Sequence, residues 1–238
     1  MNVLITICAR GGSKGIPRKN IVNVGGNFLI THTIKFAQSI FKNLNTTIAL
    51  STDDKEIKKI AEQFDLFTDY KRPANLSKDN TSKVLTIGHL LNHHEIKMNT
   101  TFEYILDLDV SSPIRNKSDV EEAFDMFKLD KKAQSLFSVN PSKRNPYYNI
   151  VERKKNGYFN IVKKPKGLLK GRQMAPKTYD MNASFYWYRR SFFDSEFETP
   201  ITNKSLIYEM KHLCFDLDYE EDLYYMKYLL KKGKIDFI

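Results

Sequence analysis

The stretch NVLITICARGGSKGIPRKN, Asn2 to Asn20, carries the first clues to the fold and the chemistry of this chain. It begins with a short β-prone run, and Ile7 to Asn20 then holds three glycines, two arginines, two lysines and a serine. In an α/β sheet, ligands bind beyond the carboxyl ends of the strands, which is where this loop lies. Glycines let the backbone approach phosphate closely, and basic side chains neutralise its charge. The stretch therefore predicts an α/β fold with a phosphate-binding loop after its first strand.

This glycine loop, residues 9–20, matches no phosphate-binding motif of fixed spacing. It has neither the G-x-x-x-x-G-K-[ST] order of a P-loop nor the G-x-G-x-x-G order of a dinucleotide fingerprint. The alternative interpretation is a solvated basic turn. The density of glycine and positive charge directly after a strand favours phosphate, which Arg10, Lys14, Arg18 and Lys19 would neutralise.

Up to Asn140 the chain alternates between strand and helix patterns. Further β-prone runs are Thr47–Thr52, Glu103–Val110 and Ser135–Asn140. Apolar residues at helical spacing predict helices after Ile30, after a capping Asp53, around Val84–Leu91, and after a capping box of Ser118 and Glu121. This alternation predicts a mostly parallel sheet covered by helices on both faces.

The pattern changes after Pro141. Two β-prone runs flank a Lys-Asn-Gly turn within Tyr147–Val162 and predict a hairpin. The strands SFYWYRR and LCFDLD and a helix over Glu220–Lys232 are then expected to complete the sheet and close the chain. We expect one α/β domain over residues 1–238, with an inserted β-rich excursion at about 141–180.

Composition limits the classes of partner. Hydrophobic residues make up 41% of the 238 residues, enough for a packed core, and the formal charge is +10. That charge raises the possibility of a nucleic-acid partner. The lysines are scattered, however, and no nucleic-acid recognition motif is present, so small anions are favoured and nucleic acid is not expected.

The cysteines and apolar runs bear on the compartment. Cys8 and Cys214 each lie in an apolar run, which predicts buried free thiols and a cytoplasmic location. No apolar run reaches transmembrane length, and the first eight residues are too short for a secretory signal. We therefore expect no membrane partner.

At ARGGSKGIPRKN the chain closely resembles the opening motif of the acylneuraminate cytidylyltransferases, the family that activates sialic acid and related nonulosonic acids. Similar elements follow in the family's order: STDD at Ser51–Asp54, RPANLSKDNTS at Arg72–Ser82, LDVSSPIR at Leu108–Arg115, GRQMAPKTYDMNASFY at Gly171–Tyr186 and FDLDYEEDL at Phe215–Leu223. The resemblance implies a Rossmann-like sheet of the nucleotide-diphospho-sugar transferase type. It also implies a transferase of EC class 2.7.7 that couples CTP to a sugar acid and releases pyrophosphate. Because the family commonly dimerises, it further implies a homodimer in which the β-rich excursion takes part.

The same resemblance assigns residues to the site. It implies that Arg10, Lys19 and Asp216 are catalytic and that a Mg²⁺ cofactor is bound by Asp216 and Asp218. The residues expected to bind CTP are Gly11, Gly12, Ser13, Asn20, Arg72 and Ser82. Those expected to bind the sugar are Asp109, Arg172, Asn182 and Tyr186. On the residues alone, Asp216 and Asp218 alternate on an expected strand and would point to the same face, where two carboxylates suit Mg²⁺ beside a triphosphate. Either aspartate is also a candidate to deprotonate the sugar hydroxyl.

Two departures from the family pattern concern the sugar. Many relatives carry Gln where this chain has Asp109, and they tend to have Asn-Gly in place of Asn182-Ala183. A carboxylate at position 109 suggests pairing with a cationic sugar substituent, such as an amidino group, or assistance to the metal. These changes favour a bacterial-type nonulosonic acid, such as legionaminic acid or a derivative, over plain N-acetylneuraminate.

Three alternatives remain open at this stage. The runner-up within the enzyme class is a CMP-3-deoxy-manno-octulosonate synthetase, of related fold and with a smaller sugar acid. A basic nucleic-acid-binding protein would show salt-sensitive binding without a preference for CTP. A catalytically dead sugar-nucleotide sensor would have no need for the paired aspartates.

Overall fold

The computed structural model describes residues 1–42, 44–165, 167 and 169–235. The chain divides into two compact units. The main unit comprises Met1–Ser138 and Asn182–Ile238, and the inserted unit comprises Val139–Met181. The excursion expected at about 141–180 falls within the inserted unit.

The main unit is built on a six-stranded sheet with the order β10-β6-β9-β5-β1-β4. Its strands are β1 (Asn2–Cys8), β4 (Asn45–Ser51), β5 (Tyr104–Leu108), β6 (Ser135–Pro141), β9 (Tyr179–Arg189) and β10 (Ser205–Glu209). Strand β1 pairs in parallel with β4 on one side and with β5 on the other, while β9 runs antiparallel to β5. The mostly parallel α/β sheet predicted from the alternation is confirmed.

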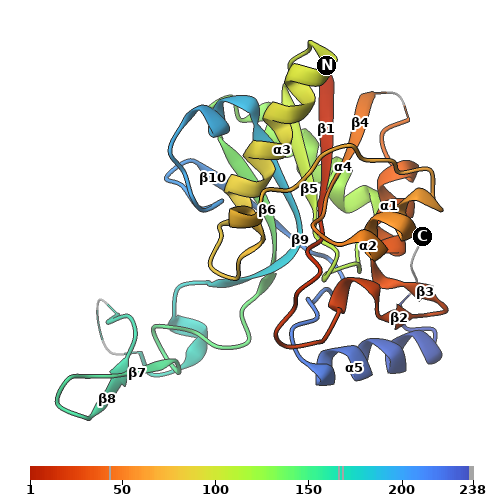
Figure 1. Ribbon diagram of the computed structural model, residues 1–238. Helices are drawn as coiled ribbons and strands as arrows, with labels where there is room; N and C mark the ends of the chain where they lie inside the picture. The colour runs from red at the N-terminus through yellow and green to blue at the C-terminus, as the bar shows by residue number, and fades with distance from the viewer. Residues whose placement is uncertain (43, 166, 168, 236–238) are drawn as a thin grey trace. The chain divides into compact units, whose positions relative to one another are not determined.

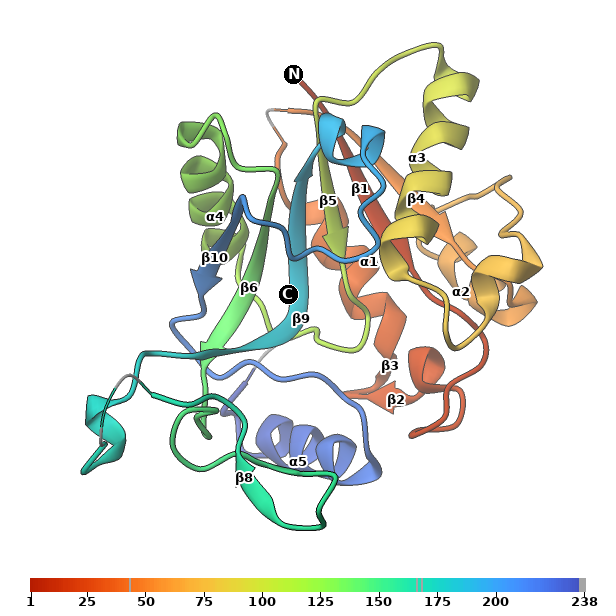
Figure 2. The same ribbon diagram turned by 90° about the vertical axis from the view of Figure 1, so that its left-hand side faces the viewer.

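Helices cover both faces of this sheet (Figures 1 and 2). The main unit has α1 (Leu29–Ser39), α2 (Lys55–Glu62), α3 (Lys83–Met98), α4 (Lys117–Leu129) and α5 (Glu220–Lys231), the small strands β2 (Asn23–Val24) and β3 (Asn27–Phe28), and the 3₁₀ turns η1 (Lys19–Ile21), η2 (Ala74–Ser77) and η4 (Arg190–Asp194). Side chains alternate along β1, so Val3 and Ile5 pack in the core with α1, α2 and α4, whereas Leu4 packs in the core with α3. Among the described residues, no helix has the length and apolar character needed to cross a membrane.

Two of the expected helix caps lie at other residues. Helix α2 is capped by Asp54, whose Oδ1 accepts from the backbone N–H groups of Glu56 at 2.8 Å and Ile57 at 3.0 Å. Asp53 instead accepts from the N–H of Gly11 at 2.9 Å, so it holds the glycine loop. The capping box of α4 is formed by Asn116 and Asp119 in place of Ser118 and Glu121, because the helix begins at Lys117.

The LCFDLD segment is not a strand, contrary to the sequence prediction. The backbone N–H of Leu217 donates to the carbonyl of Ser111 at 2.9 Å, and its carbonyl accepts from Lys19 Nζ at 2.7 Å. The segment is therefore held by loops from two sides, and the edge strand of the sheet is β10. The same-face argument for Asp216 and Asp218 fails with the strand, since Asp218 is exposed and Asp216 half-buried.

The inserted unit contains the predicted hairpin. Strands β7 (Val151–Arg153) and β8 (Phe159–Ile161) pair antiparallel, and the 3₁₀ turn η3 covers Arg172–Met174. Gly157 adopts a φ of 87° in the hairpin turn, a conformation that favours glycine. The hairpin's apolar side chains are well exposed, Tyr158 at 75% and Phe159 at 62%.

Ala183 lies in β9 with a φ of 57°, in the left-handed region that disfavours residues with a Cβ. This backbone conformation accounts for the glycine that relatives tend to carry at the position. We expect Ala183→Gly to raise the free energy of unfolding by roughly 0.5–1 kcal/mol, because relief of the strain exceeds the entropic cost of glycine. Urea unfolding of both proteins checks this, and a lower stability of the variant would contradict it.

Candidate functional site

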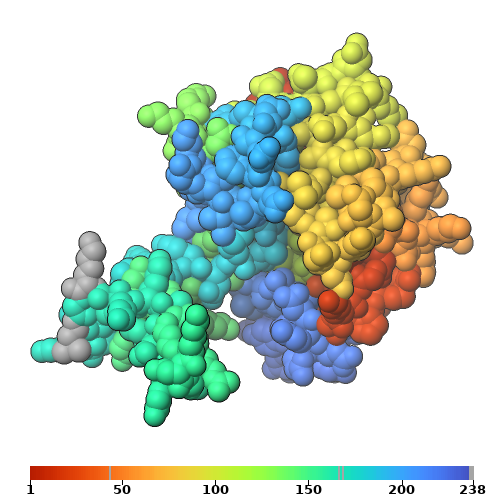
Figure 3. Space-filling view, turned by 60° about the vertical axis from the view of Figure 1, so that its left-hand side comes forward, coloured from red at the N-terminus to blue at the C-terminus, as the bar shows by residue number. Residues whose placement is uncertain are grey.

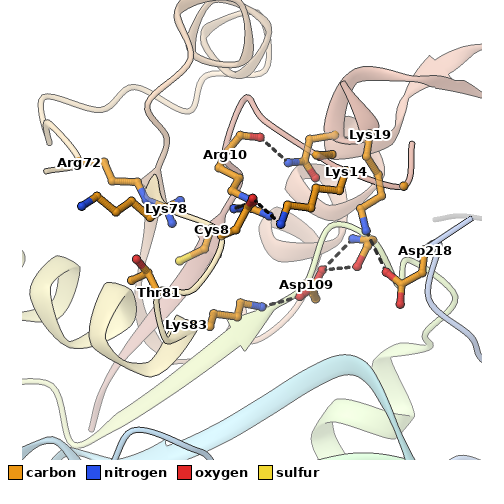
Figure 4. A pocket seen from close by; sticks show the side chains of 15 residues that line it. Cys8, Arg10, Lys14, Lys19, Arg72, Lys78, Thr81, Lys83, Asp109 and Asp218 are labelled. Carbon is orange, nitrogen blue, oxygen red and sulfur yellow. Dashed lines mark hydrogen bonds and ion pairs between the residues drawn. The ribbon is translucent and has the colours of Figure 1, made fainter. Parts of the chain in front are cut away.

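A pocket of about 380 Å³ lies at the carboxyl ends of β1 and β5 (Figure 4). It is lined by Cys8, Arg10, Ser13, Lys14, Gly15, Lys19, Asn20, Arg72, Lys78, Asp79, Thr81, Lys83, Asp109, Ser111 and Asp218. Figure 3 shows the three contributing regions on one face: the N-terminal segment in red, the start of α3 in yellow and the C-terminal segment in blue. Since β4 and β5 lie on opposite sides of β1, the pocket is at a topological switch point of the sheet, where α/β folds bind their ligands.

The charge of the lining favours a polyanion. It includes six basic side chains (Arg10, Lys14, Lys19, Arg72, Lys78 and Lys83) against three acidic ones (Asp79, Asp109 and Asp218), an excess of three positive charges. Three of the cations belong to the glycine loop. A cleft lined mainly by one sign of charge concentrates ligands of the other sign.

Asp79 holds two of the glycine-loop cations. Its carboxylate lies 2.6 Å from Arg10 Nη1 and 2.8 Å from Lys14 Nζ. Hydrogen bonds from Lys14 and Arg10 lower the pKa of Asp79, so it stays ionised at neutral pH. An anionic ligand that takes these two cations has to displace this carboxylate.

Lys19 ties the glycine loop to the segment that carries the paired aspartates. Its Nζ donates to the carbonyl of Leu217 at 2.7 Å and lies 3.2 Å from Asp218 Oδ1. The two backbones also come very close: a Cβ built on Gly15 would lie 1.9 Å from the carbonyl oxygen of Asp218. Gly15 is therefore required for this approach.

The residues predicted to bind CTP are only partly brought together. Ser13, Asn20 and Arg72 line the pocket, and the last two also hold loops: Asn20 Nδ2 donates to the Arg10 carbonyl at 2.8 Å, and Arg72 Nε donates to the Leu76 carbonyl at 2.9 Å.

Gly11, Gly12 and Ser82 are not among the lining residues. The N–H of Gly11 already donates to Asp53. Ser82 is the N-cap of α3, where its hydroxyl accepts from the N–H of Val84 at 3.2 Å.

Of the predicted sugar-binding residues in the main unit, one lines the pocket. Asp109 lines the pocket, whereas Tyr186 and Asn182 do not. Tyr186 lies beside the pocket, its ring centroid 5.5 Å from Lys83 Nζ, and Asn182 is buried and accepts from Ser138 Oγ at 2.6 Å. Arg172 belongs to the inserted unit, in which its Nη2 donates to the carbonyl of Ser142 at 2.7 Å.

Of the predicted metal pair, Asp218 lines the pocket, whereas Asp216 is half-buried and is not among the lining residues. Burial and the neighbouring charge of Asp218 raise the pKa of Asp216. Carboxylate oxygens are ligands that Mg²⁺ prefers, and one or two of them suffice beside phosphate and water. In the described part of the chain, no group of three or more His, Cys, Asp or Glu side chains could hold a metal ion on its own.

Lys83 lines the pocket and was missed by the sequence prediction. Its Nζ lies 2.6 Å from Asp107 Oδ2 and 2.6 Å from Asp109 Oδ2. A lysine at the first position of a helix is disfavoured by the helix dipole and therefore needs compensating anions. That position, together with the LDLD run of β5, is the signal that could have pointed to the pair. Lys78, Asp79 and Thr81 carry no such local signal.

Cys8 also lines the pocket without having been predicted as a site residue. Burial raises the pKa of its thiol to about 12, which leaves it protonated and unsuited to act as a nucleophile.

His212 fixes the start of the segment that leads to the paired aspartates. Its Nε2 lies 2.7 Å from Asp119 Oδ2, and this hydrogen bond raises the pKa of His212 above its usual 6.5. Tyr208 OH lies 3.4 Å from the other oxygen of Asp119. A raised folded-state pKa gives stability that is fully present below about pH 6.5 and is lost as the pH rises through the folded value.

We therefore expect His212→Gln to lower the free energy of unfolding by about 1–2 kcal/mol at pH 6 and by less at pH 8. Urea unfolding of both proteins at the two pH values measures this. An equal loss at both would show that the charge of His212 contributes nothing.

Comparison with known proteins now gives the family. Residues 4–235 match the protein family described as Cytidylyltransferase. The chain belongs to this family. It is 34% identical to the post-translational flagellin modification protein B of Campylobacter coli, over 98% of this chain and 97% of that one. It is 36% identical to the CMP-N,N'-diacetyllegionaminic acid synthase of Campylobacter jejuni, over 96% and 94% of the two chains, and 27% identical to a pseudaminic acid cytidylyltransferase of the same species, over 97% of each chain.

Solved structures show the same fold. A CMP:2-keto-3-deoxy-manno-octonic acid synthetase complexed with CTP superposes with a TM-score of 0.70 at 15% identity, over 98% of this chain and all of that one. The 4-diphosphocytidyl-2C-methyl-D-erythritol synthase of Anaerococcus prevotii superposes with a TM-score of 0.64 at 14% identity, over 96% of each chain. The family and the fold type predicted from the sequence motifs are thus confirmed.

Proposed function

We propose that this cytidylyltransferase transfers CMP from CTP to a nonulosonic acid of the legionaminic type and releases pyrophosphate. The observation that carries the proposal is the basic pocket at the switch point, in which Lys19 of the glycine loop lies beside Asp218. The 36% identity to the C. jejuni CMP-N,N'-diacetyllegionaminic acid synthase over nearly the full length supports this class of acid.

Charge stabilisation by the glycine loop is the first part of the proposed mechanism. The hydroxyl oxygen of the sugar acid forms a bond to the α-phosphorus of CTP while the bond from that phosphorus to the bridging oxygen of pyrophosphate breaks. Arg10, Lys14 and Lys19 neutralise the negative charge that gathers on the phosphate oxygens and on the leaving pyrophosphate. One of the paired aspartates, Asp216 or Asp218, accepts the hydroxyl proton.

Mg²⁺ is proposed as the cofactor, held by Asp216 and Asp218. When bound, it supplies positive charge to phosphate oxygens. In this arrangement, Lys19 holds Asp218 and the Leu217 backbone in place and adds a further positive charge to the site.

A panel of acids tests the proposed substrate. The purified protein is incubated with CTP, Mg²⁺ and either N,N'-diacetyllegionaminic, pseudaminic, N-acetylneuraminic or 3-deoxy-manno-octulosonic acid, and the CMP-sugar is resolved by anion-exchange chromatography. The highest kcat/KM is expected with the legionaminic acid. Comparable turnover of N-acetylneuraminic acid with none of the legionaminic acid would overturn the substrate class, and a preference for 3-deoxy-manno-octulosonic acid would establish the runner-up.

Asp79→Asn provides a test of the phosphate end of the pocket. Because Asp79 competes for Arg10 and Lys14, its neutralisation is expected to lower the KM for CTP roughly three- to fivefold at low salt and by less at high salt. Asp125→Asn, which removes the exposed partner of Lys128 on α4, is the matched control. An increased KM in Asp79→Asn alone would show that Asp79 supports binding of CTP.

The exposed apolar side chains of the β7–β8 hairpin support a homodimer in which a second copy covers them. Sedimentation velocity of the wild type and of a Tyr158→Ser, Phe159→Ser variant tests this. The cytoplasmic location stays a prediction.

A further inference from the structure

Lys83 and two aspartates form a charged cluster at the base of the pocket. The ammonium lies 2.6 Å from one carboxylate oxygen of each aspartate, and the side chain of Lys83 is 33% exposed, toward the pocket that it lines. Asp107 is fully buried at the end of β5, and its Oδ1 accepts from Thr6 Oγ1 at 2.8 Å. Figure 4 shows the ammonium of Lys83 directed at Asp109.

Both carboxylate oxygens of Asp109 have partners in this cluster. Its Oδ1 accepts from the N–H of Ser111 at 2.8 Å and from the Ser111 hydroxyl at 2.7 Å, while its Oδ2 faces Lys83. Burial alone would raise the pKa of Asp109, but the Lys83 ammonium holds this pKa well below its usual range. A cationic group on a ligand would therefore have to displace Lys83 from Asp109.

Lys83 keeps one donor for a ligand. An ammonium has three N–H groups, and in the described part of the chain two of them face Asp107 and Asp109. Two carboxylates around one ammonium give a net charge of zero or below, so the cluster does not attract a further anion. The third N–H suits an uncharged oxygen acceptor, such as an amide carbonyl or a hydroxyl.

The cluster lies beside residues that the motif resemblance assigns to the sugar acid. The phosphate-binding cations belong to the loop after β1, whereas Lys83 and Asp109 lie over the end of β5, next to the ring of Tyr186. Asp109 and Tyr186 are both positions that the motif resemblance assigns to the sugar acid, and Lys83 contacts both of them. A sugar acid bound at these positions thus brings its substituents toward Lys83.

We propose that Lys83 is a specificity-determining residue, which donates to an uncharged N-acyl carbonyl or hydroxyl oxygen of the sugar acid and excludes a cationic substituent from Asp109. The inference rests on the proposed function, because it names the substituent that the same pocket selects.

Kinetics with two matched acids test the role of Lys83. One acid carries an N-acetyl group and the other an acetimidoyl group, a cationic amidine, at the same position. For Lys83→Met we expect kcat/KM with the N-acetyl acid to fall roughly 10- to 100-fold, the loss associated with a charged hydrogen bond. The KM for CTP is expected to change less than about threefold, and the preference for the N-acetyl acid over the amidine to fall at least roughly 10-fold.

Two further variants separate selection from a structural role. The double variant Lys83→Met, Asp109→Asn removes the negative charge that Lys83→Met alone would leave unbalanced, so it keeps the test valid if the single variant unfolds. It should lose the preference for the N-acetyl acid without gaining activity on the amidine. Lys128→Met, the same change at an exposed lysine of α4, should leave both acids unaffected. Equal losses with both acids, or a rise confined to the KM for CTP, would overturn the assignment of Lys83. A wild-type protein that turns over neither acid would overturn the proposed function itself, and this inference with it.

Discussion

Replacement of Lys19 by methionine is expected to lower kcat/KM by roughly 10³-fold, because it removes a positive charge at the reacting phosphate and one anchor of Asp218. The Lys19 side chain is only 19% exposed, and its ammonium contacts the backbone carbonyl of Leu217 and the carboxylate of Asp218. Lys19→Arg keeps the charge but not the compact single-point contact, and it is expected to restore part of the activity. Initial rates of pyrophosphate release with CTP and the legionaminic acid measure both.

Controls separate this effect from a general loss of positive charge. Lys128→Met carries the same substitution on the exposed surface of α4, and it should match the wild type. The melting temperature of Lys19→Met should stay within a few degrees of the wild type, since the loss is about one hydrogen bond. An active Lys19→Met enzyme would show that the glycine loop does not stabilise the reaction as proposed.

Gly15→Ala is expected to cost about 1–3 kcal/mol of stability and to lower kcat/KM roughly 100-fold. A Cβ at this position would lie 1.9 Å from the carbonyl oxygen of Asp218, well inside any allowed contact. The backbone of residue 218 would have to move by more than an ångström, which takes Asp218 away from Lys19. A misplacement of this size at a carboxylate that is proposed to hold the metal is costly for catalysis.

Gly12→Ala is the matched control for stability, because a Cβ at Gly12 meets no atom within 4 Å. Its melting temperature should equal that of the wild type, whereas that of Gly15→Ala should fall. If Gly15→Ala were as stable and as active as the wild type, the close approach of the glycine loop to Asp218 would not exist in solution.

Much of the fold followed from local patterns in the sequence. The β-prone run at Asn2–Cys8, the helical stripes and the alternation between them were enough to predict the parallel sheet and the place of the pocket. These signals are strong because both faces of the sheet are buried, so each element carries its own apolar pattern. The signal for the hairpin around Gly157 was equally local, because its turn needs a residue with positive φ and the sequence has glycine there.

Errors arose where several segments compete for one role. LCFDLD is as β-prone as β10, but a contact with Ser111 and a bond from Lys19 draw it away from the sheet edge. No propensity encodes those long-range contacts. The cap of α2 moved from Asp53 to Asp54 for the same reason, because Gly11 takes Asp53.

The site was predicted in part. Arg10, Lys19, Arg72 and Asp218, which the motif resemblance assigns to the site, line one pocket, while their roles stay predictions. It could not show that Lys83 neutralises Asp109, since that contact joins the start of α3 to the end of β5. The sequence expectation of an Asp109 open to a cationic sugar group overlooked this internal cation.

The most direct test of the proposed chemistry is a ³¹P NMR time course of the protein with CTP, Mg²⁺ and N,N'-diacetyllegionaminic acid. The CTP signals are expected to be replaced in equal amounts by pyrophosphate and by one phosphodiester signal from the CMP-sugar, and Lys19→Met is expected to slow this change roughly 10³-fold. Unchanged CTP, or the appearance of free CMP without a phosphodiester, would contradict the transfer of CMP to the sugar acid.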